Sequence, residues 1–179
     1  MVDPLTTRRF AHRALYVALA AVILFLRLLP VNPMAHGIPG PDLMLAFTLT
    51  WVLRRPDFVP ALLIVAVAFV EDLMFWRPIG LWPLILLGGT EFLRARQSAA
   101  RGMPFVLEML LVSGVMLAML LANRLVLALA MVDQPPLGLE LLRYLMTLLA
   151  YPFVVALSRM AFGLRRAAPG EVDALGHPL

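Results

Sequence analysis

The chain has 179 residues, of which 62% are hydrophobic and only 15% are charged, and its mean hydropathy is +0.90. A soluble domain has about 45–50% apolar and about 25% charged residues, and one this short could not bury so much apolar surface. The composition therefore argues against a soluble enzyme or a nucleic-acid-binding protein and predicts a polytopic membrane protein, in which the absence of cysteine excludes disulfides, zinc–thiolate sites and iron–sulfur clusters.

The first apolar segment begins after three arginines near the N-terminus. It covers residues 14–29 and is interrupted only by Arg27. A signal peptide is an alternative interpretation, but residues 30–33 offer no small-x-small cleavage site and more apolar segments follow. We expect an uncleaved first helix, on which Ala14 and Ala18 form a small-xxx-small face that lets another helix approach closely.

Apolar stretches that each tolerate one or two charges predict six membrane-spanning helices, with five as the alternative count. Their expected bounds are 12–29, 41–53, 58–76, 79–94, 104–132 and 139–162. The second has only 11 uncharged residues, Leu43 to Leu53, so we expect it to be tilted, extended or half-buried by neighbouring helices. In the fourth, Pro83 and Gly88-Gly89 predict a kink or a close helix approach.

The arginines alternate between the predicted loops. The two termini and the even-numbered loops hold 11 of the 15 basic residues, whereas the odd-numbered loops hold only Arg77. This pattern is typical of six helices with both termini in the cytoplasm. It also explains the pI of about 10.6, because basic loops face an anionic membrane surface, so contact with membrane lipids is expected and nucleic acid is not. We expect one integral-membrane domain over residues 1–166 and a short flexible cytoplasmic tail over 167–179.

Charges within or beside the spans are candidate functional residues, because such charges are costly in a bilayer. At the outer ends of the predicted helices they are Arg27, Glu71, Asp72, Arg124, Glu140 and Arg143. We interpret them as a structural ion-pair network, with a site that binds a partner helix or a small ligand as the alternative. They include no nucleophile, metal-ligand set or phosphate cradle, so we expect no catalysis, metal or cofactor.

Two carboxylates lie near the opposite, cytoplasmic ends of the predicted helices. Glu91 and Arg94 are spaced i, i+3 and are expected to pair on one helix face. Glu108 is expected at a similar depth to Arg94. We interpret both carboxylates as structural. The three histidines lie in the two tails and one outer loop, which argues against a metal site.

Four short motifs follow one another between residues 41 and 94. They are Pro41-Asp42-Leu43, Trp51 with Arg54-Arg55-Pro56, Glu71-Asp72-Leu73 and Pro78-Ile79-Gly80-Leu81-Trp82. In order and spacing this stretch resembles the rod shape-determining protein MreD family, which has a "PDL" opening, an aromatic residue, a "GLLxDL" helix end and a Pro/Gly-Leu-Gly turn. The chain departs from that pattern at residues 67–70, where a small Gly is expected, and at Arg77 and Trp82.

The resemblance implies a non-enzymatic component of the bacterial inner (plasma) membrane that belongs to the cell-elongation machinery and regulates cell shape. Members of the MreD family associate with the scaffold protein MreC and, through it, with MreB filaments. They work alongside the glycosyltransferase RodA and its class B penicillin-binding protein in peptidoglycan synthesis. The implied fold is similar to the six-helix substrate-binding component of energy-coupling-factor transporters, which docks a partner through a small-xxx-small face on its first helix.

On this interpretation Asp42, Asp72, Pro78 and Gly80 shape a periplasmic face that binds MreC, and Asp72 pairs with Arg124 or Arg27. The alternative is a substrate-binding component of a vitamin-type transporter. That function predicts a pocket that opens outward and is lined by polar residues near Glu71, Arg124 and Arg143.

Overall fold

The computed structural model describes residues 4–29, 39–100 and 102–162, and all regular structure within them is helical. The elements are α1 (Pro4–Leu28), α2 (Leu43–Arg54), the 3-10 helix η1 (Pro56–Phe58), α3 (Ala61–Met74), α4 (Leu81–Ala95), α5 (Gln97–Ala100), α6 (Phe105–Leu129) and α7 (Leu137–Phe162). The six longer helices fall on the six predicted segments, which confirms an all-α architecture. The short α5 was not predicted, and the expected tail over 167–179 lies outside the described residues.

Within the described part of the chain, three helical stretches are long and apolar enough to cross a membrane. They are Arg9–Leu28 in α1, Phe105–Leu129 in α6 and Leu137–Ala161 in α7. The chain is therefore a candidate multi-pass membrane protein. The helices α2, α3 and α4 have 12, 14 and 15 residues, fewer than the roughly 20 of a typical span. The six-span topology with both termini in the cytoplasm therefore stays a prediction.

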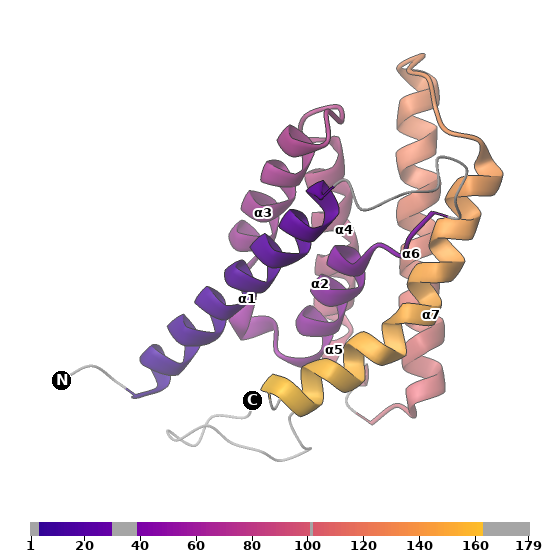
Figure 1. Cartoon of the computed structure of the whole chain (residues 1–179). Coiled ribbons are helices and arrows are strands. Elements are labelled where there is room, and N and C mark those ends of the chain that lie inside the picture. Colours follow the sequence, from indigo (N-terminus) through magenta and orange to yellow (C-terminus); the bar gives the residue numbers. More distant parts are fainter. Residues whose placement is uncertain (1–3, 30–38, 101, 163–179) are drawn as a thin grey trace.

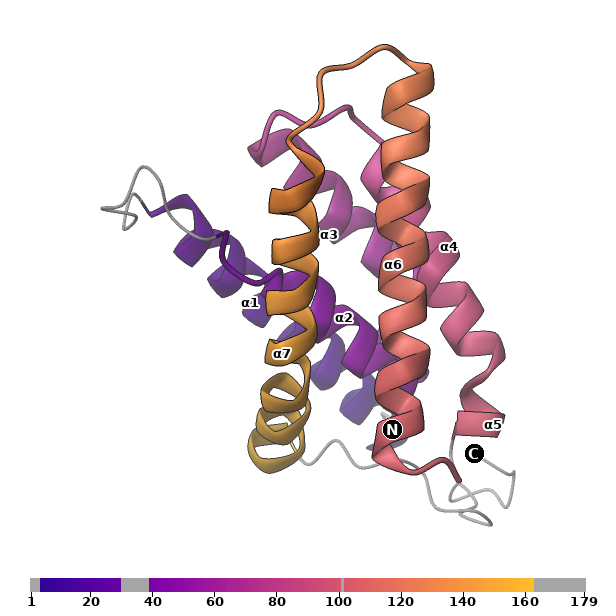
Figure 2. The same ribbon diagram turned by 90° about the vertical axis from the view of Figure 1, so that its right-hand side faces the viewer.

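Successive long helices run in opposite directions, so the bundle has two distinct ends. The α3–α4 turn and the α6–α7 loop lie together at one end, and the N-terminal start of α1 lies at the other (Figures 1 and 2). We call the first the Asp42 end, because α2 begins there after Asp42, and the second the Arg54 end, where α2 finishes. On the predicted topology the Asp42 end faces away from the cytoplasm.

The short α2 is the buried centre of the bundle. Every residue from Met44 to Arg54 is buried, because α1, α4 and α7 surround the helix. Tyr16 of α1 stacks on Phe47 with ring centroids 5.3 Å apart, and its hydroxyl lies 2.9 Å from Oγ1 of Thr48. The expectation for this segment was tilt, extension or partial burial by neighbouring helices; the structure shows burial, and it is more complete than expected.

A glycine brings α4 close to α6. A Cβ atom built on Gly89 would lie 2.6 Å from Sδ of Met119 and 3.3 Å from Cγ1 of Val115, closer than ordinary contact. Of the two predicted alternatives, a kink or a close helix approach, the structure shows a close approach, and it lies at Gly89 and not at Gly88. Pro83 lies in the first turn of α4, where its missing N–H would have no helical partner in any case, so it need not kink the helix.

Candidate functional site

Asp42 joins the start of α2 to two other helices. Its Oδ1 accepts a hydrogen bond from the backbone N–H of Leu45 at 3.1 Å, which caps the helix, and its own N–H donates to Oγ1 of Thr147 at 2.7 Å. Its Oδ2 lies 3.3 Å from Nη2 of Arg143 in α7 and 3.8 Å from Nη2 of Arg27 in α1. One carboxylate therefore fixes the relative positions of α1, α2 and α7.

Glu71 is the second buried carboxylate of this end, with a side chain only 2% exposed. Its Oε1 lies 2.5 Å from Nη1 of Arg27 and 3.5 Å from Nη1 of Arg77, which follows α3. The guanidinium of Arg27 also lies over the ring of Phe75, 4.8 Å from its centroid. Burial of this carboxylate is therefore compensated by two cations.

These contacts form a continuous chain in which cations and anions alternate. Its order is Arg77, Glu71, Arg27, Asp42 and Arg143, with each neighbouring pair within 4 Å. We call these five residues the charge network. It connects α1, α3, the α3–α4 turn, the start of α2 and α7. The ion-pair network expected at this end of the bundle is therefore present, with three guanidinium groups and two carboxylates.

Asp72, by contrast, serves the turn between α3 and α4. Its Oδ2 accepts the backbone N–H of Gly80 at 3.0 Å, and the carbonyl of Pro78 accepts the N–H of Leu81 at 3.3 Å. Gly80 has φ +89°, a conformation that costs little only for glycine. The expected pairing of Asp72 with Arg27 or Arg124 is wrong. Asp72 follows Glu71 on the helix and so points in another direction; Glu71 meets Arg27, whereas Asp72 meets the turn at Gly80.

Arg124 and Glu140 form a separate pair at the same end. Nη1 of Arg124 lies 2.6 Å from Oε2 of Glu140 and donates to the carbonyl of Pro135 at 3.0 Å, which joins α6 to α7 beside their connecting loop. All nine polar or turn residues predicted for this end therefore lie there. They form three arrangements: the charge network, the turn held by Asp72, and the Arg124–Glu140 pair.

Two residues of the site, Arg77 and Thr147, were not among the predicted site residues. Thr147 could have been found from the sequence, because it lies four residues after Arg143 and so on the same face of the helix.

A pocket of about 380 Å³ opens among these arrangements, and we call it the polar pocket. Both terminal residues of the charge network, Arg77 and Arg143, line it, together with Asp42, Asn123 and Glu140. The lining also includes apolar residues of α2, α4 and α6. The alternative function predicted a pocket lined by polar residues near Glu71, Arg124 and Arg143. Of these three residues, Arg143 lines the pocket and the other two do not.

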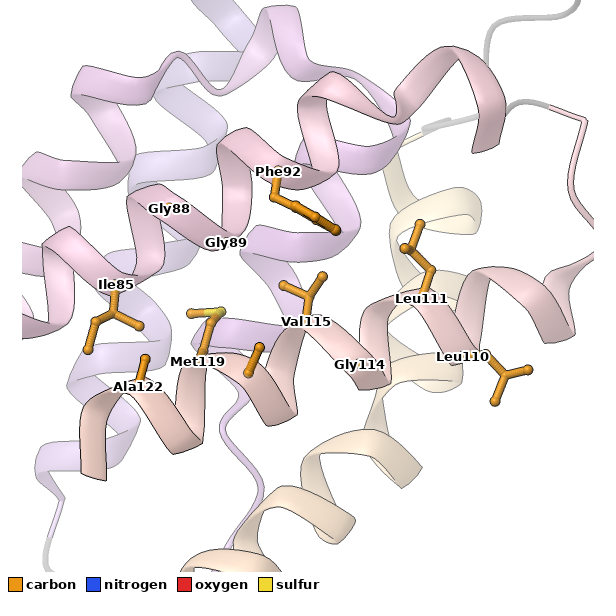
Figure 3. A pocket seen from close by; sticks show the side chains of 11 residues that line it. Ile85, Gly88, Gly89, Phe92, Leu110, Leu111, Gly114, Val115, Met119 and Ala122 are labelled. Atoms are coloured by element: carbon orange, nitrogen blue, oxygen red, sulfur yellow. The ribbon is translucent and has the colours of Figure 1, made fainter. Parts of the chain in front are cut away.

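A second, apolar cavity of about 550 Å³ lies between α4 and α6, and we call it the glycine groove. Gly88 and Gly89 of α4 and Gly114 and Ala118 of α6 are among the residues that line it. The side chain of Phe92 extends from α4 toward α6 (Figure 3). A Cβ on Gly88 or Gly114 would have no neighbour within 4 Å, so internal packing does not require either glycine.

The Arg54 end holds a buried polar cluster that the sequence analysis did not identify. Glu108, 1% exposed, lies 3.3 Å from Nη2 of Arg54 and accepts a hydrogen bond from the hydroxyl of Tyr151 at 2.8 Å. It therefore ties α6 to α2 and α7. Arg94 forms the expected i, i+3 pair with Glu91 at 3.1 Å. The sequence indicated a structural role for Glu108, but not its partners Arg54 and Tyr151.

Ala14 and Ala18 are both exposed along α1. The small-xxx-small face therefore points away from the rest of the described chain and is not used for packing within it. Among the residues that the structure describes, no three His, Asp or Glu side chains are placed to hold a metal ion. Comparisons with family models, with curated protein sequences and with solved structures gave no match.

Proposed function

We propose that the protein is a non-enzymatic membrane scaffold of the bacterial cell-elongation machinery, which binds MreC and through it links MreB filaments to the wall synthases RodA and its class B penicillin-binding protein. The proposal rests on one observation, that residues from separate motifs lie close together in the structure. Asp42, Glu71, Asp72 and Gly80 are separated by up to 38 positions in the sequence, yet they gather at the Asp42 end.

What these residues do there supports a structural role. The two buried carboxylates of the charge network are saturated by arginines, and Asp72 is used to hold a turn. None of the three is left as a free acid or base beside a nucleophile, as acid–base catalysis would need. A rigid end that joins four helices suits a surface on which another protein is held.

The surface of the bundle supports a membrane-embedded partner. The glycine groove and the exposed Ala14 and Ala18 are apolar surfaces of small residues, which let helices approach closely in a bilayer. In the proposed complex these surfaces receive transmembrane helices of partner proteins, while the Asp42 end holds the segment that emerges from the membrane.

The test is purification of the tagged full chain from its native membrane in a mild detergent, with the co-purifying proteins identified by mass spectrometry. We expect MreC and the elongation wall synthases with the wild type. Asp42→Asn, which removes the charge shared by Arg27 and Arg143, should reduce MreC recovery at least fivefold. Arg159→Gln, an exposed arginine at the other end, is the matched control and should leave recovery unchanged. Absence of MreC from the wild-type preparation would sink the proposal.

One observation favours a second candidate, a substrate-binding component of a vitamin-type transporter. The polar pocket lies at the end of the bundle where that function requires one, and Arg143 is in its wall. The same purification separates the two functions. A pair of ATPases and a transport subunit in place of MreC would support the transporter.

A further inference from the structure

The charge network begins and ends on an arginine, and both of these arginines line the polar pocket. Arg27 in the middle contacts both carboxylates, whereas Arg77 and Arg143 contact one each. Each of the two terminal arginines therefore lacks a second carboxylate neighbour, and both of them line the same pocket. One further anion between Arg77 and Arg143 would give each guanidinium two acidic neighbours and equalise cations and anions.

The two terminal arginines also have donors to spare. Arg143 contacts Asp42 through Nη2 and Arg77 contacts Glu71 through Nη1, and their side chains are 36% and 26% exposed. A guanidinium carries five N–H donors in a planar fork, a geometry that suits phosphate and carboxylate oxygens. Within the described part of the chain, the other guanidinium nitrogens of these two arginines have no hydrogen-bond partner.

The other acidic groups of the pocket do not neutralise this pair of arginines at contact distance. Glu140 is paired with Arg124 at 2.6 Å, and Asp133 is an exposed residue of the α6–α7 loop. Asn123, half-buried on α6, adds an amide that can donate to an oxygen inside the pocket.

The apolar part of the lining indicates what kind of molecule carries the anion. It includes Leu45, Met116 and Leu120, with Trp82 of α4. A pocket lined by apolar side chains and by a pair of arginines fits an amphiphile, a molecule with an apolar body and an anionic head. A volume of about 380 Å³ is near the lower limit of small-ligand pockets, so it suits a head group with the first part of its chains.

We propose that the polar pocket binds the phosphate of an anionic membrane lipid, held between Arg77 and Arg143 with the start of its acyl chains against Leu45, Met116 and Leu120. The surrounding bilayer supplies this ligand. The inference goes beyond the scaffold function and does not depend on it, since the purified protein alone should show the binding.

The test uses the full-length protein in an uncharged detergent and measures binding by native mass spectrometry. The probes are dihexanoyl phosphatidylglycerol, dihexanoyl phosphatidylcholine and inorganic phosphate. We expect saturable binding of phosphatidylglycerol, at least tenfold weaker binding of phosphatidylcholine, and no saturable binding of inorganic phosphate. If inorganic phosphate binds as tightly as phosphatidylglycerol, the proposal that the pocket binds the phosphate of a lipid is wrong.

Arg77→Gln and Arg143→Gln should each weaken phosphatidylglycerol binding at least tenfold, and Arg77→Lys should restore part of it. Arg159→Gln tests for general attraction by the basic protein and should bind as the wild type does. Arg77 lies in a turn and has a single ion pair at 3.5 Å, so its variants carry the test even where Arg143→Gln does not fold. Equal affinity of Arg77→Gln and the wild type, or no preference for phosphatidylglycerol, would overturn the proposal.

Discussion

At the scale of single residues, Asp42 combines two functions that are usually carried by different side chains. One carboxylate oxygen caps the N-terminus of α2, and the other faces Arg143 and Arg27. An N-cap needs only an acceptor oxygen, whereas the ion pairs need a full charge. Substitution by asparagine or by alanine therefore separates the contribution of the cap from that of the charge.

We expect Asp42→Asn to lower the free energy of unfolding by about 1–3 kcal/mol, because the hydrogen bond to a charged partner is lost while the cap is kept. Asp42→Ala should cost about 0.5–2 kcal/mol more, because the cap is also lost. Thermal unfolding in detergent measures both. Glu91→Gln, which removes an exposed i, i+3 pair, is the control and should change stability by no more than about 0.5 kcal/mol. Equal stability of Asp42→Ala and Glu91→Gln would contradict this role.

The sequence predicted which residues belong to the site better than it predicted which of these residues contact one another. Charges in apolar segments identified Arg27, Glu71 and Arg143, because a charge at that depth needs compensation. Which carboxylate meets which arginine depends on how each helix is rotated about its axis. Glu71 and Asp72 are neighbours in the sequence but point about 100° apart on a helix of 3.6 residues per turn, so only Glu71 reaches Arg27.

At the scale of elements, the six longer helices could be predicted because each is an apolar run bounded by charges, glycine or proline. Proline precedes the first residue of both α3 and α6, where its missing N–H is harmless. The cluster of Glu108, Arg54 and Tyr151 could not be predicted, because it depends on contacts between three helices that are far apart in the sequence.

The packing of α4 on α6 gives a prediction with a built-in control. Gly88 and Gly89 are consecutive in one helix, so replacing either by alanine gains about 1 kcal/mol of helix propensity. At Gly89 the new Cβ meets Met119 and Val115, whereas at Gly88 it meets nothing within 4 Å. We therefore expect Gly88→Ala to raise the unfolding temperature in detergent and Gly89→Ala to raise it less or lower it. A larger gain from Gly89→Ala would contradict the close approach of the two helices.

At the scale of the whole molecule, the proposals share one arrangement. It is the predicted six-span topology, in which the Asp42 end faces away from the cytoplasm and the Arg54 end faces it. Within the described residues, three helices have the length and composition to cross a membrane. The other three long helices, α2, α3 and α4, are shorter, so their crossing depends on a bundle that covers them and on a thinned bilayer.

Single cysteines placed in this cysteine-free chain test that arrangement most directly. Ile79→Cys and Asp133→Cys lie at the Asp42 end, and Asp57→Cys and Ser98→Cys at the Arg54 end, all at exposed positions. In spheroplasts, a membrane-impermeant maleimide should label the first two at once and the other two only after permeabilisation. Labelling of residues 57, 79 and 98 from the same side would show that α3 and α4 do not cross the membrane and would contradict the six-span bundle.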